Sequence, residues 1–395
     1  MTLYDNTTQM EPLLPDREVA EEKAITLMKL SHELSAKLHP ITRAAVGRLL
    51  ELMNSYYSNL IEGNQTKPLD IEKAQKRDYQ HDPKKRALQI EASAHIDVQR
   101  EFETTVRNNP SINICSSKFL CDIHQAYYEK LPIECRNVKE PNGNIIEVIP
   151  GKLRTTEVEV GHHLPPTATS IHRFLEKFEQ TYDPNAIGSS INKIIAAATS
   201  HHRLAWVHPF IDGNGRVARL FTHLYFIRAD VDSNGLWALS RGIARERERY
   251  YEMLENADHH RYNDYDGRGN LSLRGFNEFT GFVLDTAIDQ VRYMSQMVEI
   301  DTIQERLRRY ARLLAFEGKV SPEAEYILIE IFLRGEVQRS DLPMITGIAE
   351  RTVRRITKTL SERNLIVSET ALSPWRLNFP VETTPYIFPS LFPVV

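Results

Sequence analysis

Cysteine, charge of one sign and long apolar stretches are all scarce in this chain of 395 residues. Only three cysteines occur, at positions 115, 121 and 135. This number is odd and too small for a disulfide framework, and the spacing of the three fits no zinc motif. This usage predicts reduced thiols in a cytoplasmic protein. The 49 Lys and Arg residues nearly balance the 53 Asp and Glu residues. We therefore do not expect a protein that binds nucleic acid over its whole surface, although this composition is compatible with a local basic patch.

The chain also lacks an apolar run near the ~20 residues that cross a bilayer. Its amino-terminal residues have neither the basic nor the apolar region of a secretion signal. We therefore expect neither secretion nor a membrane anchor. A hydrophobic fraction of 41% and a charged fraction of 26% are typical of a globular protein, and the length suits two or three domains.

Helical periodicity dominates the sequence and predicts a mainly all-α fold. Pro40 begins one helix in the first-turn position that proline tolerates, and Gly63-Asn64 should end it. The other predicted helices cover residues 16–38, 85–107, 116–130, 168–181, 187–205, 214–229, 241–261 and 272–298. Residues 136–163 differ, because a Pro-Asn-Gly turn and alternating β-branched residues predict a small β-hairpin, an exposed flap.

The last hundred residues predict a separate module. A helix at 321–334, a short helix capped by Ser340 and ending at Gly347, a third helix at 349–364 and two short strands follow the order of a winged helix-turn-helix domain. The third helix carries basic side chains that suit a DNA major groove, namely Arg351, Arg354, Arg355, Lys358 and Arg363. A protein-binding or dimerisation module with solvated basic residues is the alternative. The apolar tail 380–395 is expected to dock on the body or on a second subunit.

The stretch 201–226, HHRLAWVHPFIDGNGRVARLFTHLYF, carries the strongest chemical signal. Gly213-Asn214-Gly215 interrupts two helical flanks and therefore predicts a tight turn that leads into a helix. Backbone N–H groups converge at such a turn, and the helix dipole adds about half a positive charge. Because glycine has no side chain, an anion such as phosphate can approach this backbone closely.

Four side chains around this turn suit phosphate chemistry. Arg216 and Arg219 lie three residues apart in the first turn of the helix and suit a polyphosphate better than a single carboxylate. Asp212 offers a hard oxygen ligand for Mg²⁺, which accompanies nucleotide phosphates. His208 can accept a proton from an attacking hydroxyl at neutral pH. Each residue alone is a weak signal, but together they predict a catalytic phosphate site.

The segment HPFIDGNGRVAR resembles, without a departure, the signature of the Fic (filamentation induced by cAMP) family, His-x-Phe-x-(Asp/Glu)-Gly-Asn-Gly-Arg-x-x-Arg. The resemblance extends over residues 110–300 and implies a Fic helical core with a β-hairpin flap. It implies transfer of AMP from ATP to a Ser, Thr or Tyr hydroxyl of a target protein. A winged helix is also familiar in bacterial members.

The resemblance assigns a role to each residue of the signature. His208 would be the catalytic base, and Asp212 would hold Mg²⁺ between the α- and β-phosphates of ATP. The amides of Gly213, Asn214 and Gly215, with the Asn214 side chain, would cradle the α-phosphate. Two further residues complete the phosphate site, because Arg216 would stabilise the departing pyrophosphate and Arg219 would hold the γ-phosphate.

A second segment, Ser58-Asn59-Leu60-Ile61-Glu62-Gly63-Asn64, lies far upstream at the end of the helix that Pro40 begins. Ser58 and Glu62 are four residues apart and so share one helix face. The segment resembles the Fic inhibitory motif, (Ser/Thr)-x-x-x-Glu-(Gly/Asn). That resemblance implies that Glu62 pairs with Arg219 and denies this arginine to the γ-phosphate, so the enzyme inhibits itself.

Further expectations concern the substrates. Tyr250, Tyr251 and Leu254 could line an adenine pocket and Asn256 could hydrogen-bond adenine, as residues at this place do in relatives. The flap at 144–163 would bind the target protein by strand addition. A homodimer is compatible with the sequence.

The domain limits that we predict are 1–110 for an N-terminal helical region, 111–300 for the Fic core, 301–379 for the winged helix and 380–395 for the tail. Two alternative functions stay open. The same fold could transfer another phosphate-containing group or remove AMP, or the chain could be a nucleotide-sensing regulator that binds DNA.

Overall fold

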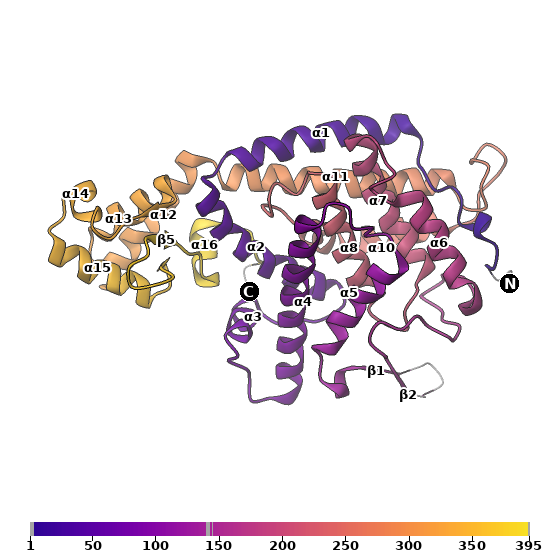
Figure 1. The fold of residues 1–395 in the computed structure, drawn as a ribbon, viewed down its shortest axis with the longest axis horizontal. Coiled ribbons are helices and arrows are strands. Elements are labelled where there is room, and N and C mark those ends of the chain that lie inside the picture. The colour runs from indigo at the N-terminus through magenta and orange to yellow at the C-terminus, as the bar shows by residue number, and fades with distance from the viewer. Residues whose placement is uncertain (1–3, 140–142, 144, 394–395) are drawn as a thin grey trace. The chain divides into compact units, whose positions relative to one another are not determined.

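The computed structural model describes residues 4–139, 143 and 145–393. The mainly helical fold that the sequence predicts is confirmed. In the first part of the chain the helices are α1 (Arg17–Ala36), α2 (Pro40–Ile61), α3 (Pro68–Gln75), α4 (Pro83–Asn108), α5 (Ser117–Glu129), α6 (Ile171–Tyr182), α7 (Ser190–Val207) and α8 (Asn214–Arg228). They are followed by α9 (Leu239–Arg245), α10 (Arg247–Asp258), α11 (Leu273–Met297), α12 (Ile300–Phe316), α13 (Ala324–Arg334), α14 (Leu342–Thr346), α15 (Glu350–Glu362) and α16 (Thr384–Ile387), as Figure 1 shows.

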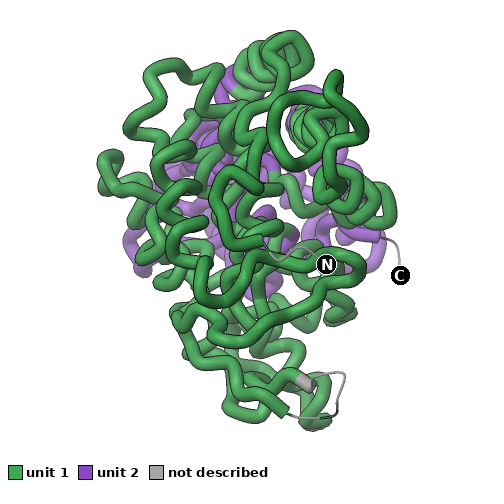
Figure 2. The backbone as a smooth tube through the Cα atoms, turned by 90° about the vertical axis from the view of Figure 1, so that its right-hand side faces the viewer, with its two compact units in different colours: residues 1–31, 54–232, 238–290 green, residues 32–53, 233–237, 291–395 purple. Residues whose placement is uncertain are grey.

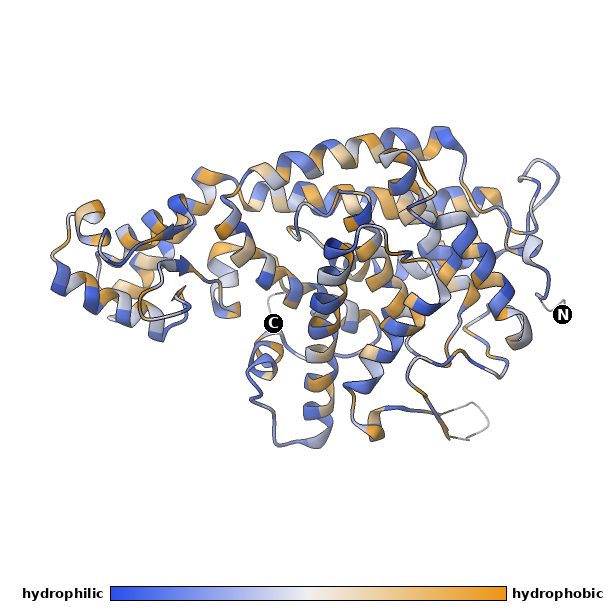
Figure 3. Ribbon diagram, in the orientation of Figure 1, coloured by the Kyte–Doolittle hydropathy of each residue, from blue (hydrophilic) through white to orange (hydrophobic). Residues whose placement is uncertain are grey.

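The strands are few and short: β1 (Asn137–Lys139), β2 (Ile145–Glu147), β3 (Glu336–Val337), β4 (Ile366–Val367) and β5 (Trp375–Leu377). Hydrophilic and hydrophobic residues are interleaved along the helices (Figure 3), the pattern of helices that bury one face. No helix in the described ranges is long and apolar enough to cross a membrane.

The chain forms two compact units, coloured separately in Figure 2. Unit 1 comprises residues 1–31, 54–232 and 238–290, and unit 2 comprises residues 32–53, 233–237 and 291–395. Unit 1 therefore includes residues from both the predicted N-terminal region and the predicted Fic core.

Helix α8 is the centre of unit 1. Every residue from Val217 to Phe226 is buried, and helices α4, α5 and α7 pack against α8. The rings of Phe178 on α6 and Phe221 on α8 lie 5.6 Å apart between centroids. Because α8 is enclosed on all sides, its amino end is held in one place, which is what a binding site at that end requires.

The predicted flap is present but shorter than expected. Strands β1 and β2 form an antiparallel pair in which Val138 faces Ile146. Residues 140–142 and 144, including the first residue of the predicted flap, lie outside the described residues. From 148 to 163, all of it described, the only regular pairing is an isolated bridge between Val160 and His163. The chain is instead fixed by Arg154, whose backbone N–H donates to the Pro209 carbonyl at 2.9 Å.

The predicted helix at 241–261 is two helices. Glu246 separates α9 from α10 with φ −118° and ψ 39°. Helix α9 approaches α11 so closely at Gly242 that a side chain there would overlap Thr286. This close packing sets the direction of α9 independently of α10, which periodicity alone could not reveal. Helices α3, α12 and α16 were not predicted.

In unit 2, β3, β5 and β4 form an antiparallel sheet in that order, beside helices α13, α14 and α15. This is the element order predicted for a winged helix, and the winged-helix class stays a prediction. Ser340 does not cap α14, because its hydroxyl bonds the Asp341 carboxylate at 2.9 Å. Gly347 ends α14 in the left-handed conformation, with φ 68°.

The tail packs within unit 2. Phe388 and Leu391 are fully buried, and helix α16 lies against α12. The Tyr293 hydroxyl donates a hydrogen bond to the Pro389 carbonyl at 2.9 Å. The apolar residues of the tail therefore have a partner within this chain.

Two glycines of α11 provide a test of how unit 1 packs. A side chain at Gly275 would overlap the backbone of Asn256 on α10, whereas Gly281 faces open space. We expect Gly275→Ala to destabilise the protein by about 1–3 kcal/mol through overpacking. Gly281→Ala is the matched control and should stabilise by up to about 1 kcal/mol, because alanine favours the helix. Urea unfolding of both variants measures this, and equal effects would contradict the packing described.

Candidate active site

The tight turn that the sequence predicts lies between α7 and α8, and its backbone is strained at His208, which the sequence did not indicate. His208 ends α7 with φ 47° and ψ 61°, a left-handed conformation that is rare for a residue with a side chain, and Gly213 begins α8 with φ 81°. The Asn214 side chain closes the loop between them. Its amide donates to the Phe210 carbonyl at 2.8 Å and accepts from the Phe210 N–H at 2.9 Å.

This bracing revises one expectation. Because the Asn214 amide is committed to Phe210, the side chain does not point freely toward a phosphate. The backbone N–H groups at the amino end of α8, toward which the helix dipole is directed, stay the predicted anion site. In this structure the Asn214 side chain shapes the loop.

His208 is held neutral. Burial is the main cause that lowers the pKa of His208 to about 4, and His163 and Arg154 nearby act in the same direction. The Arg154 side chain also fixes the backbone of His208, donating from Nε to its carbonyl at 2.8 Å. A neutral imidazole can accept a proton at physiological pH, so this group is ready to act as a base.

A pocket of about 420 Å³ in unit 1 joins these features. His208, Asn214, Gly215 and Arg219 line it together with Glu62. Its other lining residues are Val160, Gly161, His162, His163, Ala205, Trp206, Tyr250, Tyr251, Leu254, Glu255 and Asp258. The pocket thus combines a base, a glycine turn and an arginine with an apolar and aromatic side.

The residues predicted for adenine divide into two groups. Tyr250, Tyr251 and Leu254 do line the pocket. The Tyr250 hydroxyl lies 2.8 Å from Nε2 of His201, so its position is fixed. Asn256 is not among the lining residues, because it lies on another face of α10, where its carbonyl packs against Gly275.

Asp212 and Arg216 form a separate cluster beside the turn. One Asp212 carboxylate oxygen accepts hydrogen bonds from the Tyr128 hydroxyl at 2.6 Å and from Arg216 at 3.2 Å. Burial alone would raise the pKa of Asp212, but Arg216 and Tyr128 hold it below its ordinary value. Arg216 is also paired with Glu91 of α4, a residue that the sequence did not single out.

Glu62 is paired with Arg219, as the resemblance to the Fic inhibitory motif implies. Its carboxylate is 2.6 Å from Nη2 of Arg219. Ser58 adds two contacts, accepting from Arg219 at its hydroxyl (3.0 Å) and at its carbonyl (3.1 Å). The carboxylate also covers Gly215, because a side chain at that position would overlap it. Glu62 therefore occupies both the arginine and the space above the turn.

Glu62 is ionised in this position. Burial acts to raise the pKa of its carboxyl group, but the guanidinium groups of Arg219 and Arg216 hold that pKa below its ordinary value. Arg219 is itself buried, with 4% of its surface exposed. A buried cation needs an anionic partner, and here this partner comes from the end of α2.

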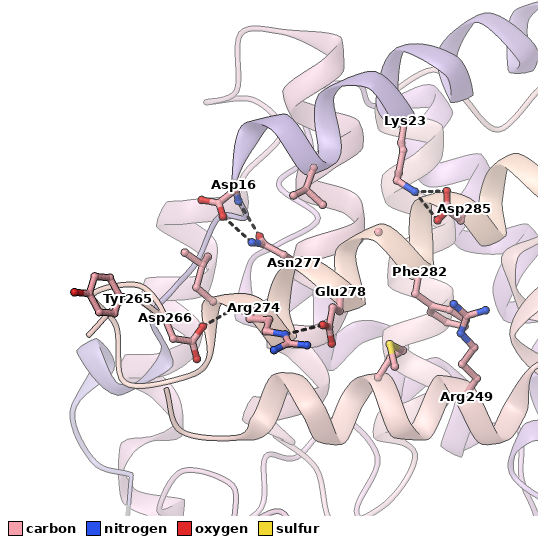
Figure 4. A pocket seen from close by; sticks show the side chains of 14 residues that line it. Asp16, Lys23, Arg249, Tyr265, Asp266, Arg274, Asn277, Glu278, Phe282 and Asp285 are labelled. Atoms are coloured by element: carbon pink, nitrogen blue, oxygen red, sulfur yellow. Dashed lines mark hydrogen bonds and ion pairs between the residues drawn. The ribbon is translucent and has the colours of Figure 1, made fainter. Parts of the chain in front are cut away.

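A larger groove of about 530 Å³ also lies in unit 1 but holds none of the predicted site residues. Figure 4 shows two ion pairs among the side chains that line it. Lys23 pairs with Asp285 at 2.5 Å and Arg274 with Glu278 at 3.1 Å. These groups are satisfied within the groove, so the pocket at His208 is the better candidate for chemistry.

The basic residues predicted for DNA lie on α15 in unit 2. Arg351, Arg354, Arg355 and Lys358 are all exposed. Arg354 pairs with Glu350 at 2.6 Å, and Lys358 lies 3.9 Å from Glu362. The positive face is therefore present, with part of its charge balanced by glutamates of the same helix.

Comparison with known proteins finds a match for the part of the chain that contains His208 and the glycine turn. Residues 115–226 match the model of the Fic/DOC family. Two relatives are each named protein adenylyltransferase Fic. The one from Drosophila grimshawi is 32% identical over 140 residues, which is 34% of this chain and 28% of the relative. The one from Nematostella vectensis is 28% identical over 209 residues, which is 52% of this chain and 42% of the relative.

Solved structures show a similar fold. A Fic family protein from Desulfovibrio desulfuricans G20 is 16% identical, with a TM-score of 0.52 over 90% of this chain and 96% of that one. Fic-1 from C. elegans is 19% identical, with a TM-score of 0.51 over 70% of this chain and 72% of that one. The chain spans less than half of the length of the curated relatives described above.

The protonation state of His208 can be tested directly. With a pKa of about 4, its imidazole should stay neutral as the pH falls from 8 to 5 and should gain a proton only below that range. NMR of histidine labelled with ¹³C at Cε1, assigned by the loss of one signal in His208→Ala, measures the titration. A midpoint near the ordinary value of 6.5 would contradict this account.

Proposed function

We propose that this chain is a protein adenylyltransferase, restrained by its own Glu62, that transfers AMP from ATP to a hydroxyl of a target protein. The observation that carries the proposal is one pocket in which neutral His208, the glycine turn and Arg219 lie together. Relatives that share part of the chain and are named protein adenylyltransferase Fic support the same reaction.

In the proposed reaction, His208 takes the proton of a Ser, Thr or Tyr hydroxyl as its oxygen attacks the α-phosphorus of ATP. Pyrophosphate leaves as the bond between the α-phosphorus and its bridging oxygen breaks. The N–H groups of Gly213, Asn214 and Gly215 hold the α-phosphate, and Arg219 holds the γ-phosphate. Most of the rate gain in such a transfer comes from positioning and from charge neutralisation.

Mg²⁺ fits the residues beside this turn. Asp212 is ionised, because Arg216 and Tyr128 lower its pKa against the effect of burial. Mg²⁺ is commonly held by one or two carboxylates together with substrate phosphates. Asp212 would hold the ion, which would neutralise phosphate charge during the transfer.

The flap offers a place for the target protein. Its apolar side chains at Ile145, Ile149 and Val160 are exposed by 70%, 51% and 40%. A target segment added beside β2 would bond through its main chain and rest on these side chains. Such binding would place a target hydroxyl near the pocket, of which Val160 forms part.

Glu62 acts as the restraint in this proposal. Its carboxylate holds Arg219 and covers Gly215, so a γ-phosphate would meet an anion where it needs a cation. We expect Glu62→Gly to raise AMP transfer by more than about tenfold, because the arginine becomes available to align the phosphates. Incubation with Mg²⁺ and α-labelled ATP, read by intact-protein mass spectrometry and on lysate proteins, measures this.

Two variants control this experiment. Glu62→Gly/His208→Ala should lose the label, which ties the reaction to the base. Glu129→Gly removes a glutamate from the end of α5 and should label like the wild type. The assay is repeated with the other nucleoside triphosphates, which addresses transfer of another group. Equal labelling of wild type and Glu62→Gly would contradict the restraint.

A nucleotide-sensing regulator that binds DNA is the second candidate, and the exposed basic face of α15 favours it. Arg351 and Arg355 lie one turn apart on this face. We expect Arg351→Ala/Arg355→Ala to weaken binding to a duplex from the gene's own promoter and to reduce the slope of log K against log salt by about 2. Gel shifts at several salt concentrations measure it, and an unchanged slope would exclude this face.

A further inference from the structure

Helix α4 connects the end of α2 with α8. On the α2 side, the Ser55 hydroxyl donates to the Ala92 carbonyl at 2.7 Å. On the α8 side, Nε2 of His223 lies 2.7 Å from the Glu103 carboxylate. Helix α4 therefore contacts both the segment that carries Glu62 and the helix that carries the two arginines.

Glu91, on the same helix, bonds both neighbours with one carboxylate. One oxygen is paired with Nη1 of Arg216, and the other accepts a hydrogen bond from the Asn64 side chain at 2.7 Å. Only 19% of the Glu91 side chain is exposed. A mostly buried carboxylate with two such partners is fixed in place, so moving either partner disturbs the other.

Asn64 is itself rigid and lies two residues after Glu62. Its amide group also donates to the Leu88 carbonyl at 3.2 Å, and its side-chain oxygen accepts from the N–H and hydroxyl of Thr66 at 3.0 and 2.7 Å. The short segment from Glu62 to Asn64 thus reaches Arg219 directly and Arg216 through Glu91.

The donors of Arg216 are largely occupied in this arrangement. Besides Glu91, its guanidinium bonds the hydroxyls of Tyr127 at 3.3 Å and Tyr128 at 3.2 Å and the Asp212 carboxylate at 3.2 Å. Nε of Arg216 has no hydrogen-bond partner among the described residues, so a phosphate oxygen competes with these partners at the two terminal nitrogens. Among the partners, Glu91 is the one that is also bonded to the segment that follows Glu62.

We infer that Glu91 is a second inhibitory residue, which holds Arg216 as Glu62 holds Arg219 and which is coupled to Glu62 through Asn64. The inference rests on the proposed function only in that the two arginines bind a polyphosphate. It implies that binding of the polyphosphate loosens both ion pairs together, so removal of one carboxylate weakens the hold of the other.

The test measures binding rather than transfer. Isothermal titration with ATP and with inorganic tripolyphosphate is performed on the wild type, Glu91→Gln, Glu62→Gly and the double variant. Glutamine keeps the size of Glu91 and one acceptor oxygen, removes its charge, and replaces the second oxygen by an NH₂ group that cannot accept. We expect Glu91→Gln to bind both probes about tenfold more tightly than the wild type, because a competing anion has gone.

Glu103→Gln is the matched control. It removes the charge of another ion pair between α4 and α8, at His223, that does not involve the arginines. If Glu91 only stabilises the packing of α4 on α8, the two glutamine variants should behave alike, and our inference is wrong. We expect Glu103→Gln to bind the probes like the wild type.

The coupling is tested with Asn64→Ala. We expect the combined gain of Glu62→Gly and Glu91→Gln to differ from the product of the single gains, and to approach that product when Asn64 is alanine. Asn64→Ala also leaves Glu91 unchanged, so this variant can replace Glu91→Gln in the binding experiment if Glu91→Gln does not fold. Independent gains in both backgrounds would refute the coupling.

The outcomes separate this inference from the proposed reaction. If Glu91→Gln binds the probes tightly but no variant transfers AMP, Glu91 is an inhibitory residue of a polyphosphate site and the proposed reaction is wrong. If Glu62→Gly activates AMP transfer and Glu91→Gln changes neither transfer nor binding, the proposed reaction is supported and the inhibitory role of Glu91 is wrong. If no variant binds either probe, the inference is overturned, since there is no polyphosphate for Glu91 to exclude.

Discussion

Two guanidinium groups at the amino end of α8 require anionic partners, and much of unit 1 is arranged around this requirement. Arg216 and Arg219 lie where the helix dipole is also positive, so an unpaired state would be costly. Glu62 provides a partner from the end of α2, Glu91 from α4 and Asp212 from the turn itself. A site of this kind attracts polyphosphate for the same reason that it holds carboxylates.

The left-handed backbone of His208 is a second constraint, and it depends on the packing around it. Arg154 donates to the carbonyl of His208, and Asn214 bonds the backbone of Phe210. These contacts stabilise a conformation that the residue would not adopt by itself. They hold the imidazole in a partly buried place where it stays neutral.

The sequence predicted the parts of the site that are local in the chain. The glycine turn, His208, Asp212 and the two arginines lie within one short segment, so periodicity and turn chemistry were sufficient to single them out, and their roles stay predictions. The Fic resemblance also predicted the pairing of Glu62 with Arg219. The mainly helical fold followed from the same periodicity.

Contacts between distant segments were not predictable from the residues. Glu91 and Tyr128 look like ordinary helix positions until α4 and α5 pack against α8. The break at Glu246 depends on how closely α9 approaches α11. Whether Asn256 faces the pocket could be known only from the position of α10. One chain without aligned relatives contains no signal for such pairs.

The most direct test of the account is a crystal structure of Glu62→Gly with ATP bound. We predict the γ-phosphate within hydrogen-bond distance of the Arg219 guanidinium and the α-phosphate above the N–H groups of Gly213 and Gly215. ATP bound away from this turn, or bound there with its γ-phosphate far from Arg219, would contradict the claim that Glu62 occupies the place of a phosphate.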